Sequence, residues 1–139
     1  MTLRTKILFS SGFPDDAIYG ADNGVEVFGG RNIAETLKAA FERSGYRVSD
    51  PVDVGDHGWA LDIWSGRRRM SLQVSVIDTD ENYLVAESFG FWPSRKLLRQ
   101  LLGDLQRILE ADGRFSQIGW LPMRGSGRHM APAAGPFDP

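Results

Sequence analysis

The stretch WALDIWSGRRRMSLQVSV, Trp59–Val76, decides the fold that this sequence predicts. Apolar and polar residues alternate in WALDIW, where Trp59, Leu61 and Ile63 share one side, and alternate again from Met70 onward. Because successive side chains of a strand point to opposite faces, this pattern predicts two antiparallel strands, each with one buried and one wet face. The Ser-Gly pair between them predicts a tight hairpin turn.

Two other segments have the helical period. In GGRNIAETLKAAFERSGY, apolar residues recur at helical spacing, and we predict Asn32 as the N-cap with Glu35 reaching back in a capping box. Gly45 is placed to end this helix in the left-handed conformation. The second helix starts at Ser94, carries a broad leucine stripe and ends at Gly113.

These elements predict an α+β fold, a two-layer sandwich in which two helices pack on one face of an antiparallel sheet of about four to six strands. GFPDDAIYGADNG is rich in turn formers and predicts a loop. Pro51 cannot donate a ladder hydrogen bond, so the piece before WALDIW is predicted at the sheet edge. Residues 1–123 form the predicted domain, and the Gly- and Pro-rich residues 124–139 a flexible tail.

The composition excludes several classes of function. The chain has 139 residues, no cysteine and a formal net charge of -2, so thiol nucleophiles and zinc–thiolate sites are excluded and a generally basic nucleic-acid binder is not indicated. The first residues contain only a short apolar run, Ile7–Phe9, and no stretch has the about 20 apolar residues of a membrane helix. We therefore expect a cytoplasmic protein that does not contact a membrane.

Candidate catalytic and metal-binding residues are few. Asp56 and His57 are adjacent, and neighbours on a strand face opposite ways, so GDHG predicts a turn rather than a base with its orienting acid. The carboxylates of Asp15, Asp16 and Asp22 could hold a hard cation, but their spacing does not fit a calcium loop. Stabilisation of the loop backbone is the alternative role for these aspartates. The sequence thus favours a non-enzymatic role with no catalytic residue and no cofactor, and leaves a metal-dependent hydrolase as a less favoured hypothesis.

Clustered cations and aromatic side chains are more informative. Three arginines follow the predicted hairpin turn, and three more cations occupy the first turns of the second helix, where they oppose the helix dipole by roughly 0.3–1 kcal/mol each. Such a charge arrangement needs acidic groups, either within the same protein or on a ligand or partner. Aromatic side chains on the open sheet face would mark an interaction surface. The predicted partner-binding residues are Trp64, Arg67, Arg68, Arg69, Tyr83, Arg95, Lys96 and Arg99.

The run from Gly30 to Val74, with GRNIAE, GYRVSDP and GDHGW, resembles small bacterial proteins of unknown function. These are similar in general plan to immunity-type and other interaction domains found beside toxin genes. The resemblance implies an α+β inhibitor or binding module. We therefore predict a protein-binding module that acts through the open sheet face and the basic hairpin, with a nucleic-acid or anionic-ligand binder as the alternative. A homodimer contact could occupy the same face.

Overall fold

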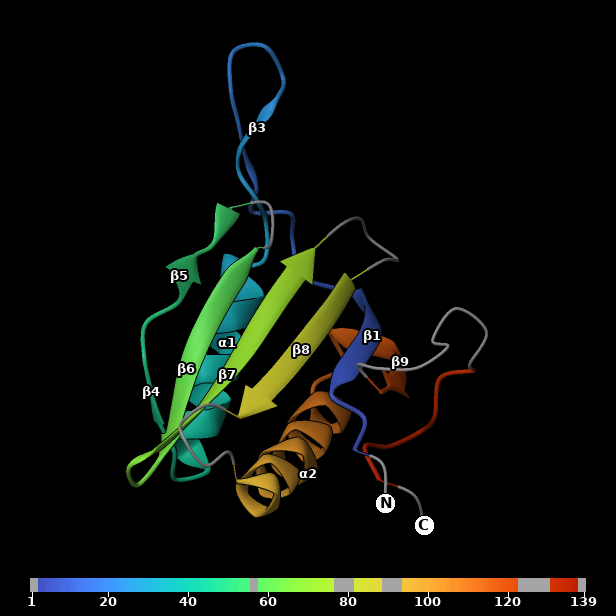
Figure 1. Cartoon of the computed structure of the whole chain (residues 1–139). Coiled ribbons are helices and arrows are strands. Elements are labelled where there is room, and N and C mark those ends of the chain that lie inside the picture. Colours follow the sequence, from blue (N-terminus) through green and yellow to red (C-terminus); the bar gives the residue numbers. More distant parts are fainter. Residues whose placement is uncertain (1–2, 56–57, 77–81, 89–93, 123–130, 138–139) are drawn as a thin grey trace.

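The computed structural model describes residues 3–55, 58–76, 82–88, 94–122 and 131–137 (Figure 1). Both predicted helices are present, and the two alternating stretches form neighbouring strands. In chain order the elements are β1 Lys6–Ser11, β2 Ile18–Tyr19, β3 Val25–Val27, α1 Arg31–Arg43, β4 Arg47–Val48, β5 Val52–Asp53, β6 Trp59–Ser65, β7 Arg68–Val76, β8 Asn82–Ser88, α2 Arg95–Ala111 and β9 Phe115–Leu121.

The main sheet is antiparallel and has the order β4-β6-β7-β8-β1-β9, with β5 also paired to β6 (Figure 1). The predicted tight β6–β7 hairpin is present, but its two turn residues are Gly66 and Arg67 rather than Ser65 and Gly66, because Ser65 pairs with Arg68. The described residues form seven strands in this sheet rather than four to six, since Pro51 separates β4 from β5 on one edge. β1, the first strand in the sequence, lies between β8 and β9.

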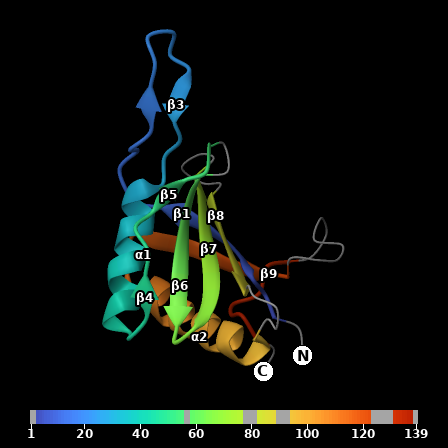
Figure 2. The ribbon, with the colours of Figure 1, turned by 60° about the vertical axis from the view of Figure 1, so that its left-hand side comes forward.

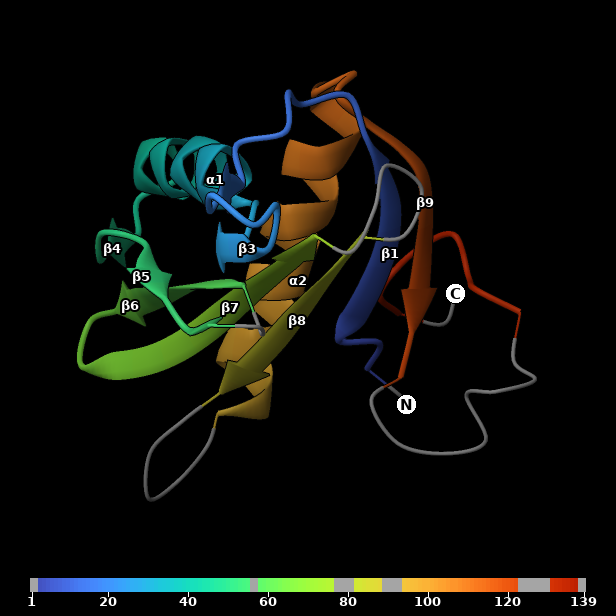
Figure 3. The ribbon, with the colours of Figure 1, turned by 90° about the horizontal axis from the view of Figure 1, so that it is seen from above.

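Both helices lie on one face of the main sheet, which confirms the predicted α+β class (Figures 2 and 3). The alternation in β6 and β7 explains the layering, because the side chains of Leu61, Ile63, Met70, Leu72 and Val74 are all fully buried. Burial of each such side chain contributes about 1.5–3 kcal/mol. The leucine stripe of α2 completes this core with Leu101, Leu102, Leu105 and Leu109.

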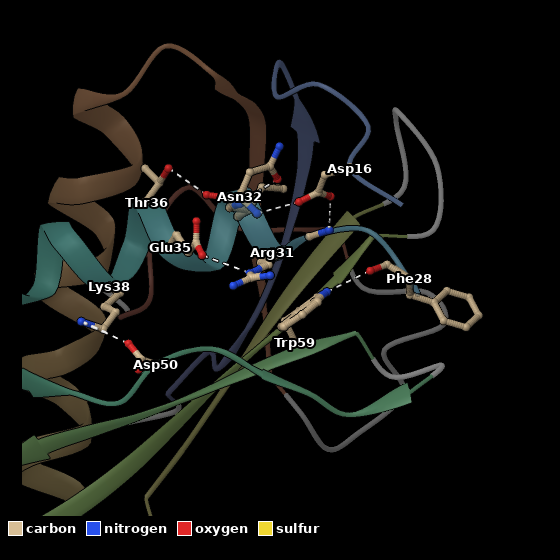
Figure 4. Close-up of polar contacts among 11 residues, drawn as sticks. Asp16, Phe28, Arg31, Asn32, Glu35, Thr36, Lys38, Asp50 and Trp59 are labelled. Carbon is tan, nitrogen blue, oxygen red and sulfur yellow. Dashed lines mark hydrogen bonds and ion pairs between the residues drawn. The ribbon is translucent and has the colours of Figure 1, made fainter. Parts of the chain in front are cut away.

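The N-terminus of α1 is capped from a distance, and the predicted capping box is wrong. Asp16 accepts hydrogen bonds from the backbone N–H groups of Gly30 at 2.8 Å and Asn32 at 2.7 Å (Figure 4). α1 begins at Arg31 with Gly30 as the N-cap residue, so Asn32 lies inside the helix, where its side chain donates to the Pro14 carbonyl and accepts from the Ile33 N–H. Glu35 pairs with Arg31 at 3.1 Å rather than reaching back. A local pattern could not reveal an acceptor that lies 16 residues away.

The other predicted helix ends are close to those observed. Gly45 has a φ of 98° and follows the last turn of α1, as predicted. The Ser94 side chain accepts a hydrogen bond from the Leu97 N–H at 3.2 Å, which confirms it as the N-cap of α2. α2 ends at Ala111, two residues before Gly113, and its C-cap residue Asp112 has an extended backbone.

A buried polar contact joins the end of α1 to α2. The hydroxyl of Tyr46 donates to the Asp104 carboxylate at 2.6 Å, and both side chains are buried. Arg107 forms an ion pair with the same carboxylate from one turn further along α2. Burial raises the pKa of Tyr46 above its ordinary value. The negative charge of Asp104 is unfavourable with respect to the helix dipole. Here, however, its carboxylate accepts a hydrogen bond from the buried Tyr46 hydroxyl, and a buried polar group without a partner would be costly.

Residues 131–137, part of the predicted tail, lie against the folded domain. Ala133 and Trp120 exchange two backbone hydrogen bonds of 2.9 Å, so this segment extends the sheet beyond β9. The Arg4 N–H donates to the Pro136 carbonyl at 3.0 Å, and Phe137 packs against the core. These contacts attach residues 131–137 to the domain. The predicted domain boundary after residue 123 and the predicted flexibility of residues 124–139 stay predictions.

Replacement of Tyr46 by Phe should lower the free energy of unfolding by about 1–2 kcal/mol, because the buried Asp104 carboxylate loses a hydrogen-bond donor. Urea unfolding at neutral pH measures the change. Tyr19→Phe is the matched control, since its hydroxyl also donates to an aspartate but lies on an exposed segment. A loss in Tyr46→Phe no larger than in Tyr19→Phe would show that the buried contact contributes little.

Replacement of Gly119 by Ala should detach the C-terminal segment, because a Cβ atom there would lie 2.4 Å from the Cβ of Pro132. We expect faster proteolysis of residues 131–137 and a loss of about 1–3 kcal/mol in unfolding free energy. Gly113→Ala serves as the control, since a Cβ atom there has no described atom within 4 Å. Equal protease resistance of the two variants would contradict the predicted close approach.

Candidate functional site

The sheet face opposite the helices is the surface that the sequence singles out. It carries the alternate side chains of β6, β7, β8 and β1, and no described helix lies over it (Figure 2). Cross-strand partners share a face, so the register defines rows of neighbouring side chains. Two such rows are Asp62–Ser71–Glu87 and Ala60–Gln73–Val85–Lys6. The open face is thus mainly polar, with small and half-buried apolar side chains between.

Trp64 lies between two arginines at one end of this face. Arg47 on β4 and Arg69 on β7 are its register partners on either side. The Arg47 guanidinium lies 4.8 Å from the centre of the Trp64 ring, a cation–π contact that leaves the indole half-buried. Arg69 lies 3.8 Å from Asp62, which neutralises part of its charge. We call Arg47, Trp64 and Arg69 the cation–indole row.

The two remaining predicted arginines of the β6–β7 hairpin lie next to this row. Arg67 and Arg68 are exposed at the turn beside this row, but only Arg47 and Arg69 share the open face with Trp64, because Arg68 alternates to the opposite side of β7. Tyr83 lies on the same face further along the sheet, opposite Ser75 and Leu8. The Lys6 ammonium lies 4.9 Å from its ring centre, so Tyr83 is covered by a cation in the same manner as Trp64.

The cations of α2 do not join the open face. Arg95, Lys96 and Arg99 occupy the first turns of α2, which belongs to the helix layer (Figures 1 and 3). The start of α2 lies at the same end of the domain as the β6–β7 hairpin (Figure 1). Arg99 lies 5.0 Å from the ring of Phe137, so an aromatic ring contributes to stabilising this cation. The predicted partner-binding residues are therefore divided between two layers.

Sequence reasoning missed a projecting β-arm. Residues 12–30, predicted as a loop up to Gly24, contain β2 and β3, which pair and extend away from the main sheet at the end opposite the β6–β7 turn (Figure 1). Ile18, Tyr19 and Val25 are 54%, 54% and 42% exposed on it. The strands are too short to show a period, but the dipeptide Asn-Gly at 23–24 is a turn signal that could have predicted a hairpin.

The aspartates of the arm stabilise its backbone. Asp15 accepts from the Ala17 N–H at 3.0 Å and from the Tyr19 hydroxyl at 2.8 Å, and these hydrogen bonds hold the pKa of Asp15 below its ordinary value. Asp22 accepts from the Gly24 N–H at 3.0 Å, while Asp16 caps α1. Among the described residues, no group of three potential metal ligands comes together. Asp56 and His57 lie outside the described residues.

Comparison with known proteins adds no assignment. No family model, no curated protein and no solved structure matches the chain. Within the described ranges, no helix has the length and apolar character needed to cross a membrane.

Replacement of Asp16 by Ala should lower the free energy of unfolding by about 0.5–2 kcal/mol, because two N–H groups at the start of α1 lose their acceptor. Amide hydrogen exchange of Gly30 and Asn32 should speed up in parallel. Asp22→Ala removes a carboxylate from the same arm without touching α1 and should leave both measurements nearly unchanged. An unchanged exchange rate in Asp16→Ala would rule out the long-range cap.

Proposed function

We propose that this protein is a cytoplasmic protein-binding module, whose contact surface is the open sheet face with the β6–β7 hairpin. The observation that carries the proposal is the cation–indole row: an indole held between two arginines on a sheet face that no described helix covers. Trp and Arg are the side chains that most often dominate binding energy at protein interfaces. Arg47 fixes the ring orientation before a partner arrives, so little conformational entropy is lost on binding.

Charge indicates the kind of partner. Arg47 and Arg69 flank Trp64 on the open face, and Arg67 and Arg68 lie at the adjacent turn, so this end of the domain is rich in arginine. An acidic protein surface would complement this end of the face and be steered toward it. A toxin-neutralising, immunity-like inhibitor is the specific form that the resemblance over residues 30–74 suggests, and it requires no cofactor.

An alternative function uses the same residues. Arginines beside an exposed ring edge can also hold single-stranded nucleic acid, with phosphates on the guanidinium groups and a base on the aromatic ring. A base would have to stack on the face of the Trp64 ring, but the Arg47 guanidinium already lies 4.8 Å from the centre of that ring. This contact favours a partner that meets the edges of the Arg47 and Trp64 side chains. We therefore place the protein partner first and keep the nucleic-acid ligand as an outcome of the test.

Trp64→Ala should weaken partner binding by about 30-fold or more, the effect of losing an interface anchor worth about 2 kcal/mol. Arg69→Ala should weaken it to a smaller degree. The measurement is quantitative co-purification from lysate of the source organism, with the captured protein then titrated against each purified variant. Wild-type protein should recover one protein in stoichiometric amount.

Arg43→Ala is the matched control, because it removes an exposed arginine from the last turn of α1 in the helix layer. It should bind as the wild type does. Recovery of no stoichiometric protein, or equal binding by Trp64→Ala, would contradict the proposal. Recovery of nucleic acid that is released as salt is raised would assign the face to the alternative function.

A further inference from the structure

A cavity of about 460 Å³ lies at the base of the β-arm, where α1 begins and where β1, β7 and β8 reach the end of the sheet. Its walls come from residues far apart in the sequence, since the arm supplies one side and Tyr83 on β8 the other. The β-arm, which supplies part of its lining, leaves the domain at the end opposite the β6–β7 turn (Figure 1). The cavity is therefore separate from the cation–indole row.

Aromatic rings are the first distinctive feature of this cavity. Phe13, Tyr19, Phe28 and Tyr83 all line it. The face of an aromatic ring attracts cations, and this chain already uses that attraction at two of the four rings. Arg114 lies 4.2 Å from the ring centre of Phe13, and Lys6 lies 4.9 Å from that of Tyr83. In the part of the chain that the structure describes, no lysine or arginine lines the cavity or stacks on the other two rings.

Negative charge is the second feature. Asp15 lines the cavity, and its carboxylate is held in place by the Ala17 N–H and the Tyr19 hydroxyl. An ionised carboxylate can accept about four hydrogen bonds, so these two donors leave capacity for a ligand. Their hydrogen bonds hold the pKa of Asp15 low, so the group is charged at neutral pH. Residues 12–30 contain four acidic side chains and no lysine, arginine or histidine.

The same geometry excludes an anionic ligand. A helix N-terminus is otherwise a ready anion site, but the Gly30 and Asn32 N–H groups of α1 already donate to Asp16. A metal ion is not indicated either, because the described residues bring no three potential ligands together. The ligand that best fits a carboxylate beside aromatic rings is a flat cation such as a guanidinium group. A guanidinium can stack on a ring and, in its own plane, donate two parallel hydrogen bonds to a carboxylate.

We propose that the cavity at the base of the β-arm receives an arginine side chain of a partner protein, which stacks on the Phe28 ring and donates to Asp15, the carboxylate that the Tyr19 hydroxyl holds. The exposed Ile18, Tyr19 and Val25 then lie beside the backbone that carries this arginine. This site rests on the proposed function only in supposing a protein partner. It can be tested without one, so its failure is distinguishable from failure of the open sheet face.

The experiment is an NMR titration of the 15N-labelled full chain with N-acetyl-arginine methylamide, and with the neutral isostere N-acetyl-citrulline methylamide. The arginine probe should shift the Ala17, Tyr19 and Gly29 amides saturably with a Kd on the order of 1–10 mM, as for one anchored side chain. Asp15→Asn should weaken this binding at least tenfold. Asp22→Asn is the matched control, because it removes one arm carboxylate that does not line the cavity.

Three results would overturn the proposal: equal shifts with the citrulline probe, unchanged affinity in Asp15→Asn, or an equal loss in Asp22→Asn. Tighter binding of N-acetyl-lysine methylamide would overturn the preference for guanidinium. If Asp15→Asn rearranges the whole arm spectrum, Phe28→Leu decides the matter, since it keeps an apolar wall and removes the ring. Affinity retained in Phe28→Leu would then refute the aromatic contact.

Discussion

One-sided burial of the antiparallel sheet is the constraint on which the rest of the structure depends. The fully buried positions of β6 and β7, Leu61, Ile63, Met70, Leu72 and Val74, lie on the helix side of the sheet, so a shift of either strand by one residue would expose them and bury polar side chains. The helices are therefore confined to one layer. The opposite face keeps its polar rows, and the side chains that could meet a partner are the ones that core packing does not use.

The β-arm depends on a second, more local constraint. Asp16, at the base of the arm before β2, accepts hydrogen bonds from the Gly30 and Asn32 N–H groups at the start of α1. The same carboxylate therefore joins the base of the arm to α1 and stabilises the helix. Asp15, the residue before Asp16, is held by hydrogen bonds from the Ala17 N–H and the Tyr19 hydroxyl, and it lines the cavity. Adjacent aspartates thus have different roles, one in folding and one in shaping a surface. Neither role requires the metal ion that their number suggested.

Sequence patterns predicted what depends on near neighbours. The alternation of β6 and β7, the leucine stripe of α2 and its Ser94 cap are encoded within a few residues, and the fold class follows from them. The missed features depend on residues far apart: Asp16 capping α1, β1 lying between β8 and β9, and Arg47 covering Trp64. The residues VEVF predicted the extended piece that forms β3, but β2 and its pairing with β3 were missed, since these strands have only two and three residues. Whether the predicted binding residues bind a partner stays a prediction.

The placement of charge has a consequence for how any partner approaches. Acidic side chains without a basic one occupy the arm, while Arg67–Arg69 and the first turns of α2 occupy the far end of the domain (Figure 1). The formal net charge is only -2, so the two ends of the domain differ in charge much more than the whole chain departs from neutrality. A charged partner would therefore meet a different charge at each end of the domain. At 0.1 M salt the influence of exposed charges reaches about 10 Å, so this separation of charge would act on the orientation of a partner only in the last steps of its approach.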